Sequence, residues 1–236
     1  MKNSVACPNC NCQNPTYNYV CSTCRYYLRD RIYNIDLWSV ASSIVESPDE
    51  AFRKIVYAEH KNFIFFIFIF ACLKFLINVR FISMISIGEF QSSMELLYSY
   101  LILFGITLIF FLLFSFTHKI IGKIYDINIR LKDSLTIIIY AQLPFLFGLI
   151  ILFPLEVVIL GDYLFSLNPT PFTIKGTISY LFLAIELALT VWNAFLIFKA
   201  FHSQSNYYPF SILTSFTFIV LFWTLLYFCS QIVFTI

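Results

Sequence analysis

Four cysteines near the start of the chain have the spacing of a metal site. Cys7 and Cys10 form one C-x-x-C pair, Cys21 and Cys24 form a second, and ten residues separate the pairs. Each pair places two thiolates on one tight turn, and a hairpin between the turns would bring all four to a single tetrahedral ion. The pattern therefore predicts a structural Zn²⁺ site with Cys7, Cys10, Cys21 and Cys24 as its ligands.

Other uses of these thiols stay open. Cys12 is a fifth thiol in the same segment and could compete as a ligand. A disulfide pair is the main alternative, and the reducing cytoplasm to which this segment is assigned below disfavours it. A redox dithiol is disfavoured because it needs only one C-x-x-C pair. Cys72 and Cys229 stand alone in apolar runs and are expected to be inert small hydrophobes.

Residues 1–35 are expected to form the module that holds the cysteines. Residues 16–20 alternate aromatic and polar side chains, which predicts a half-exposed strand. A module of this size cannot bury enough apolar surface to fold alone. A bound metal would therefore supply most of its stability. Through CPNC, the following Asn-Pro and CSTC, the segment resembles the zinc ribbons of bacterial membrane and regulatory proteins. Asn11 and Arg25 stand where that pattern usually has glycine, which leaves the turn geometry open.

The chain as a whole has the composition of a membrane protein. Of 236 residues, 60% are hydrophobic and 12% are charged, against about 45–50% and about 25% in soluble domains. The net charge of +2 gives no indication of nucleic-acid binding. Five apolar segments are long enough to cross a bilayer as helices: residues 63–82, 96–116, 134–160, 176–198 and 209–234. The predicted fold is an all-α polytopic membrane protein, with a five-helix transmembrane bundle at 63–236, a connector at 36–62 and the ribbon at 1–35.

The connector shows the pattern of amphipathic helices. Its apolar residues recur at helical spacing on one face, and Ser47 divides it. Pro48 suits the first position of a helix, and Glu50 stands where a capping box has an acid. We expect a helix over 48–60 that lies at the membrane interface with its apolar face on lipid, in preference to one packed on another soluble domain.

Basic residues alternate between the connections and give an orientation. They are plentiful before the first span and in the second connection, absent from the first connection and single in the third. The basic residues before the first span and in the second connection are Arg53, Lys54, Lys61, Lys119, Lys123, Arg130 and Lys132. By the positive-inside rule, the N-terminus and ribbon are cytoplasmic and the C-terminus lies outside. The first 35 residues lack the apolar core of a signal peptide, and a bacterial inner membrane is the expected location.

Four polar residues of the apolar segments are the candidates for a membrane-interior site. Lys74 of the first span and Glu186 of the fourth lie deepest, and an unpaired charge there costs at least about 2.5–3.5 kcal/mol. They are expected to pair or to face a polar interior, which Gln142 and Asn193 would complete through interhelical hydrogen bonds. A structural ion pair is favoured over a proton or ion path.

The third span carries two prolines and a carboxylate. Pro144 lies ten residues into the segment and is expected to kink the helix. Pro154 falls near the outer boundary, where a helix can simply end, so only Pro144 is required to bend the span. Glu156 is therefore expected at the outer edge rather than in the interior.

Four features together resemble the Yip1 family of five-span membrane proteins with a cytoplasmic N-terminus. They are the SPDEAFRKI and AEHKN runs before the first span, the basic second connection, the YAQLP run at 140–144, and five spans with a very short C-terminus. The resemblance begins at Leu37. It implies a role related to membrane trafficking, since eukaryotic members are implicated in vesicle traffic and bind small GTPases. GTPase binding is not carried over, because the cytoplasmic part here is a ribbon and a helix.

The sequence favours a non-enzymatic membrane adaptor or organiser. Its expected partners are the lipid bilayer and an unidentified cytoplasmic protein that the ribbon recruits, with a homo-oligomer or larger membrane complex left open. The alternative is a transporter or permeation subunit. An intramembrane enzyme is disfavoured because His60, His118 and His202 have no metal-ligand spacing and are expected to be solvated at the cytoplasmic edge.

Overall fold

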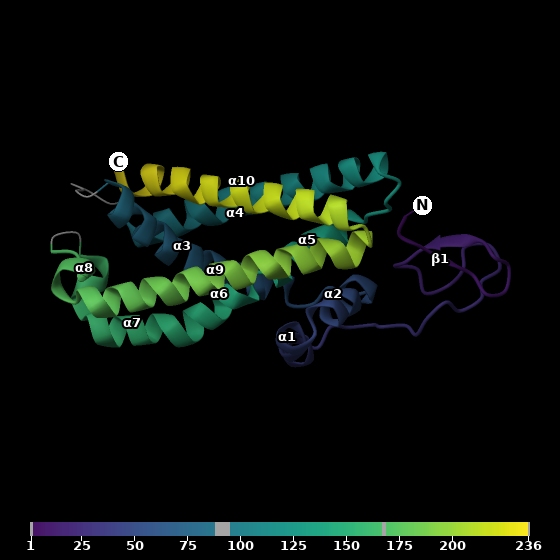
Figure 1. The fold of residues 1–236 in the computed structure, drawn as a ribbon, viewed down its shortest axis with the longest axis horizontal. Helices are drawn as coiled ribbons and strands as arrows, with labels where there is room; N and C mark the ends of the chain where they lie inside the picture. Colours follow the sequence, from purple (N-terminus) through teal and green to yellow (C-terminus); the bar gives the residue numbers. More distant parts are fainter. Residues whose placement is uncertain (1, 88–94, 167–168, 236) are drawn as a thin grey trace. The chain divides into compact units, whose positions relative to one another are not determined.

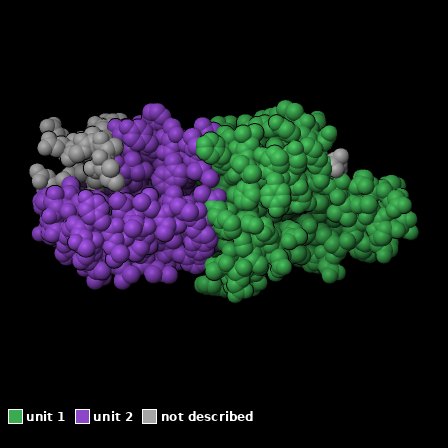
Figure 2. Space-filling model, viewed as in Figure 1, with its two compact units in different colours: residues 1–64, 111–141, 195–218 green, residues 65–110, 142–194, 219–236 purple. Residues whose placement is uncertain are grey.

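The computed structural model describes residues 2–87, 95–166 and 169–235 and is mainly α-helical (Figure 1). The chain forms two compact units (Figure 2). Unit 1 contains Met1–Ile64, Phe111–Ala141 and Phe195–Phe218, and unit 2 contains Phe65–Phe110, Gln142–Ala194 and Ile219–Ile236. The ribbon and connector therefore belong to unit 1.

The ribbon consists of two short hairpins. Strands β1 (Ser4–Ala6) and β2 (Gln13–Pro15) pair antiparallel, and a single bridge joins Val20 to Tyr27. A β-hairpin in the ribbon is confirmed, but it encloses the first cysteine turn instead of lying between the two turns, and the strand predicted at 16–20 is wrong. Pro15 ends β2, and its carbonyl accepts a hydrogen bond from the N–H of Asn18 (3.0 Å), which turns the chain. The aromatic residues of this segment instead pack against arginine side chains. For example, the guanidinium of Arg130 lies 4.2 Å from the ring centre of Tyr17.

The connector forms two helices, α1 (Leu37–Glu46) and α2 (Pro48–Tyr57). The predicted start at Pro48 is confirmed, and the Asp36 side chain caps α1 by accepting from the N–H of Trp38 (3.3 Å). The apolar side of α2 is at most 2% exposed and faces α1 and α5. The face that we expected on lipid is therefore covered by the protein's own helices. An amphipathic stripe has the same pattern in either setting.

Five helical segments of the described chain are long and apolar enough to cross a membrane. Four are α3 (Ile64–Ile87), α4 (Leu96–Ile124), α9 (Gly176–Ser205) and α10 (Tyr208–Thr235), and the third in sequence is Leu131–Leu164. All five predicted spans are confirmed, so the protein is an integral membrane protein. Helices α4 and α9 continue past their predicted ends, because polar residues such as Lys119 and Lys123 end the apolar run without ending the helix.

The third span is interrupted twice. It comprises α5 (Leu131–Tyr140), α6 (Leu143–Phe147), the π-helical turn η1 (Gly148–Leu152) and α7 (Phe153–Leu160). The break expected from Pro144 occurs at Ala141–Gln142, because proline cannot donate to the carbonyl four residues before it. The helix does not end at Pro154 and reaches the predicted boundary at Leu160. The π turn, in which the N–H of Phe153 reaches the carbonyl of Gly148, accommodates that proline, and the helix continues to Leu160.

After α7 the chain makes a 3₁₀ turn, η2 (Gly161–Phe165), and a short helix, α8 (Pro171–Ile174), before α9 begins. In the core of unit 2, Phe75 of α3 makes edge-to-face contacts with Phe145 of α6 (5.4 Å) and Phe222 of α10 (5.0 Å). These rings join three of the spans within the unit.

The core of unit 1 contains a histidine. His118 is 1% exposed, its Nδ1 lies 3.0 Å from the hydroxyl of Ser134, and its ring packs on Phe201 and Phe210. The expectation that this histidine is solvated is therefore wrong. The aromatic residues around it come from α9 and α10, whose return to this end of the unit could not be read from local sequence.

A buried ion pair fastens the connector to α5. The ammonium of Lys61 lies 3.0 Å from a carboxylate oxygen of Asp133, and the two side chains are 2% and 1% exposed. Lys61 also donates to the carbonyls of Ile55 and Val56 at the end of α2. Burial lowers the pKa of Lys61 to about 8. Lys61 therefore makes its polar contacts inside unit 1, where it joins the connector to α5.

Candidate metal centre

The two cysteine turns are built in the same way. In the first, the N–H of Asn11 donates to the carbonyl of Cys7 (2.9 Å), and in the second, the N–H of Arg25 donates to the carbonyl of Cys21 (3.1 Å). Asn11 and Arg25 both have left-handed backbone angles, with φ of 54° and 59°. These are the positions where the ribbon pattern usually has glycine, so the turn geometry is kept without it.

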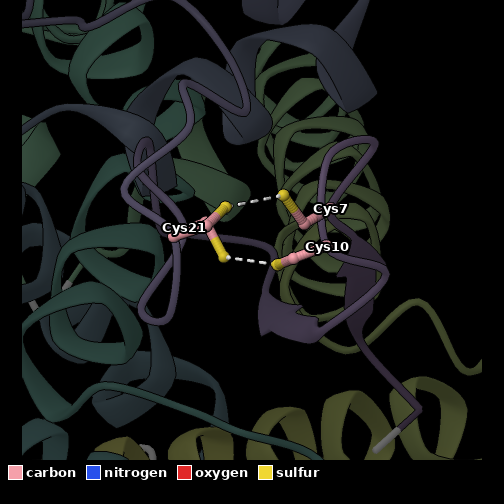
Figure 3. Close-up of side chains that lie close together, drawn as sticks. Cys7, Cys10 and Cys21 are labelled. Carbon is pink, nitrogen blue, oxygen red and sulfur yellow. Dashed lines mark hydrogen bonds between the residues drawn. The ribbon is translucent and has the colours of Figure 1, made fainter.

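The four predicted ligand atoms lie together. The Sγ atoms of Cys7, Cys10, Cys21 and Cys24 are all within 4.8 Å of one another. The sulfurs of Cys7 and Cys24 are 3.5 Å apart. Those of Cys10 and Cys21, both labelled in Figure 3, are 3.6 Å apart. Zinc with Zn–S bonds of about 2.3 Å needs sulfurs about 3.8 Å apart in a tetrahedron. The four thiols could therefore hold one metal ion with small adjustments.

A buried asparagine joins the two turns. Asn14 is fully buried, and its amide nitrogen donates to the carbonyl of Cys12 (2.9 Å) and lies 3.4 Å from the sulfur of Cys21. Its amide oxygen accepts from the N–H (2.9 Å) and the hydroxyl (3.0 Å) of Ser22. Sequence analysis noted Asn14 only as part of an Asn-Pro pair. Its role depends on contacts eight residues away, which spacing alone does not reveal.

Backbone N–H groups favour the thiolate form of two of these cysteines. The pKa of Cys21 is lowered to about 6, most strongly by the backbone N–H of Cys24. The pKa of Cys24 is lowered by the backbone N–H of Tyr26. Because the thiolate is the form that binds a metal, these N–H groups prepare the site for a cation.

Cys12 lies outside the four-thiol group. Its carbonyl accepts from the N–H of Cys7 (3.0 Å), as the carbonyl of Tyr26 accepts from the N–H of Cys21 (2.9 Å). Cys12 and Tyr26 therefore occupy equivalent places in the two turns. The described residues give Cys12 a backbone role, and the group of thiols that could hold a metal ion contains the four predicted cysteines without it.

The ribbon is bonded to the rest of unit 1 through its first residues. The side chain of Asn3 donates to the carbonyls of Asn128 (2.8 Å) and Gln204 (3.0 Å) and accepts from the N–H of Asn128 (2.8 Å). Asn3 is 1% exposed, and the ammonium of Lys2 lies 3.8 Å from the ring centre of Tyr207. These contacts fix the ribbon to the second and fourth connections.

The four membrane-interior candidates form two pairs in unit 2. Lys74 is fully buried and ion-paired with Glu186, whose side chain is 12% exposed. Asn193 donates from its side-chain nitrogen to the amide oxygen of Gln142 (3.1 Å). Both pairs join different spans. Each therefore satisfies polar groups that would be costly if left alone in lipid.

The structure adds two residues to this interior that sequence analysis missed. Glu156, expected at the outer edge, is fully buried, because α7 continues past Pro154 and turns the carboxylate inward. Gly148 makes room for Lys74, since a Cβ there would lie 3.2 Å from Cε of Lys74 and 2.8 Å from Cδ1 of Leu189. The presence of a carboxylate within an apolar run was the available signal for Glu156.

Comparison with known proteins gives one family. The Yip1 domain matches residues 42–233 of this chain. The chain belongs to the Yip1 family. The matched Yip1 domain includes α2 and all five apolar segments, and the four cysteines lie before it. No curated protein and no solved structure matches the chain. The four-cysteine ribbon, which could hold a metal ion, is therefore a feature that this Yip1 protein carries in addition to the matched domain.

Proposed function

We propose that this protein is a non-enzymatic membrane adaptor whose zinc ribbon recruits a cytoplasmic protein. The observation that carries the proposal is a complete set of four thiols on a module bonded to the bundle. Four cysteine ligands fill a tetrahedral shell and leave no position for water or substrate. The metal would therefore hold the ribbon in shape, and the proposal includes no catalytic step.

Zinc is the metal that best fits the donor set. Soft thiolates in tetrahedral arrangement favour zinc or iron–sulfur chemistry over magnesium, calcium and manganese. The four sulfurs lie within 4.8 Å of one another, which suits one ion. Cys7, Cys10, Cys21 and Cys24 would hold it, and Asn14 would orient the sulfur of Cys21.

The charge distribution supports a cytoplasmic ribbon. The ribbon belongs to unit 1, and α2, α4 and the start of α5 carry exposed basic side chains of the same unit: Arg53, Lys54, Lys119, Lys123 and Lys132. By the positive-inside rule we assign this side to the cytoplasm and the C-terminus to the outside of a bacterial inner membrane. Reporter fusions would test this. Alkaline phosphatase should be active at the C-terminus and inactive at the N-terminus, and the reverse pattern would reject the orientation.

The ribbon offers aromatic side chains for contact with a partner. Tyr26 and Tyr27 are 48% and 74% exposed, and Val5 is 43% exposed. Aromatic residues are enriched in protein interfaces and depleted from purely solvated surfaces. We therefore place the recruiting surface on the ribbon around the second cysteine turn.

Gentle purification of the full chain from native membranes tests recruitment. A protein that copurifies with the wild type should be lost from Cys21→Ser, which removes a ligand, and from Tyr27→Ser, which keeps the site. Cys12→Ser is the matched control and should retain it. A partner profile that is identical in all four samples would reject the ribbon as the recruiting element.

A transporter or permeation subunit is the second candidate. The interrupted third span and the ionisable residues Lys74, Glu186 and Glu156 favour it, since broken helices form substrate sites in transporters. Reconstituted protein should then show flux that Glu186→Gln abolishes. Absence of flux for ions, amines and lipids would dispose of this candidate and leave the adaptor proposal standing.

A further inference from the structure

A small cavity lies within unit 2, among its membrane helices. Its volume is about 180 Å³, and its walls come from α3, α7, α8, α9 and α10. A cavity of about 150 Å³ is large enough for benzene. This one can therefore accept a group of about six to eight non-hydrogen atoms, but not a large solute.

Three side chains on the cavity wall carry hydrogen-bond acceptors that lack donors, whereas the hydroxyls of Ser179 and Thr190 on the same wall donate to backbone carbonyls. Neither carboxylate oxygen of Glu156 has a partner among the described residues, although this side chain is fully buried. The same holds for the side-chain oxygen of Asn78, which is 7% exposed, and for one carboxylate oxygen of Glu186. Both glutamates and Asn78 line the cavity. Buried acceptors without donors are costly, so this arrangement favours a ligand that donates.

The charges around the cavity also do not balance. Lys74 is the ammonium bonded to this cluster, and its partner is the other carboxylate oxygen of Glu186. Gly148 holds the stem of Lys74 in a narrow space, since an added Cβ would lie 3.2 Å from its Cε. No hydrogen bond joins Lys74 to Glu156 among the described residues. With both glutamates ionised, the described cluster carries one negative charge more than positive charge, which favours a cation.

The apolar walls define the rest of the ligand. Four aromatic residues line the cavity together with leucine, isoleucine and proline side chains: Phe81, Phe172, Phe182 and Trp223. Aromatic faces attract ammonium groups and also cover apolar groups. A hydrated metal ion would find few oxygens here and would leave most of the wall uncovered.

We propose that this cavity binds a primary ammonium group attached to a small apolar body, with Glu156, Glu186 and Asn78 accepting its N–H groups. The ligand can be a soluble alkylamine or the ammonium of an aminophospholipid headgroup. The site is independent of the ribbon and of protein recruitment. It requires neither zinc nor a partner.

Binding is tested on the full-length protein purified in a nonionic detergent. Hexylamine should raise the melting temperature, read from tryptophan fluorescence, and should bind measurably by calorimetry. Hexanol has the same length without the charge, and should bind about ten- to a hundredfold more weakly, because a charged hydrogen bond is lost. Equal stabilisation by the two compounds, or none by either, would overturn the proposal.

Variants assign the binding to the carboxylates. Glu156→Gln keeps the shape and should weaken hexylamine binding by about ten- to a hundredfold, while the ligand-free variant melts at or above the wild-type temperature. Glu46→Gln, at an exposed position of α1, is the matched control and should bind as the wild type does. Unchanged affinity of a folded Glu156→Gln would also overturn the site.

The source of the ammonium is distinguished in nanodiscs. If phosphatidylethanolamine supplies it, nanodiscs containing this lipid should raise the apparent Kd of hexylamine relative to phosphatidylglycerol nanodiscs. Equal Kd values in the two lipids would assign the site to a soluble amine. Both results support the ammonium site and choose between its two sources.

Discussion

Replacing Lys74 by methionine should strongly destabilise unit 2. The Lys74 side chain is fully buried and that of Glu186 is 12% exposed, so water cannot screen the charge left behind. Removing one partner of such a pair costs about 3–5 kcal/mol, whereas replacing both by apolar residues of similar size is often neutral. This cost is a large fraction of a typical total stability of about 5–15 kcal/mol.

The assay is reversible unfolding of the full chain in detergent micelles, followed by tryptophan fluorescence. Lys74→Met should lose about 3–5 kcal/mol, and Lys74→Met with Glu186→Leu should recover most of that loss. Lys123→Met, at an exposed position near the end of α4, is the control and should change stability by less than about 0.5 kcal/mol. The reasoning is refuted if Lys74→Met unfolds as the wild type does, or if the double variant is as unstable as the single one.

Three further predictions concern the ribbon, the π turn and the connector. Asn14→Ala should weaken metal affinity by about ten- to a hundredfold in a chelator competition, whereas the exposed Asn9→Ala should leave it unchanged; equal affinities would remove Asn14 from the site. Gly148→Ala should destabilise the protein by about 1–3 kcal/mol in the same unfolding assay, because the added Cβ would meet Leu189 Cδ1 at 2.8 Å, and unchanged stability would argue against this packing. Burial lowers the pKa of Lys61 to about 8 from an ordinary value of 10.5, so between these values the unfolded chain holds more protons and the free energy of unfolding should rise with pH. Lys61→Met should lose that rise, and an identical pH profile would contradict it.

The ribbon and the spans could be predicted because their signals are local. Two C-x-x-C pairs fix the spacing of four thiols without reference to the rest of the chain, and apolar length is a sum over about 20 neighbouring residues. The break before Pro144 is also local, since proline acts on the carbonyl four residues earlier. These features therefore appear in the structure much as the sequence indicates.

The rest depends on contacts between distant segments. The apolar face of α2 has one pattern whether lipid or protein covers it, so its burial beside α5 could not be predicted. The inward position of Glu156 depends on the π turn that carries α7 past Pro154. Asn14 and His118 gain their roles from partners that only the folded chain brings to them.

The metal content of the purified full chain tests the central claim most directly. The four-thiol site predicts one zinc ion per chain in the wild type and in Cys12→Ser, and loss of zinc in Cys7→Ser and Cys24→Ser. Elemental analysis of the four proteins, each purified in the same detergent without added metal, gives the answer. Full retention of zinc in both Cys7→Ser and Cys24→Ser would contradict the site and, with it, the adaptor proposal that depends on an ordered ribbon.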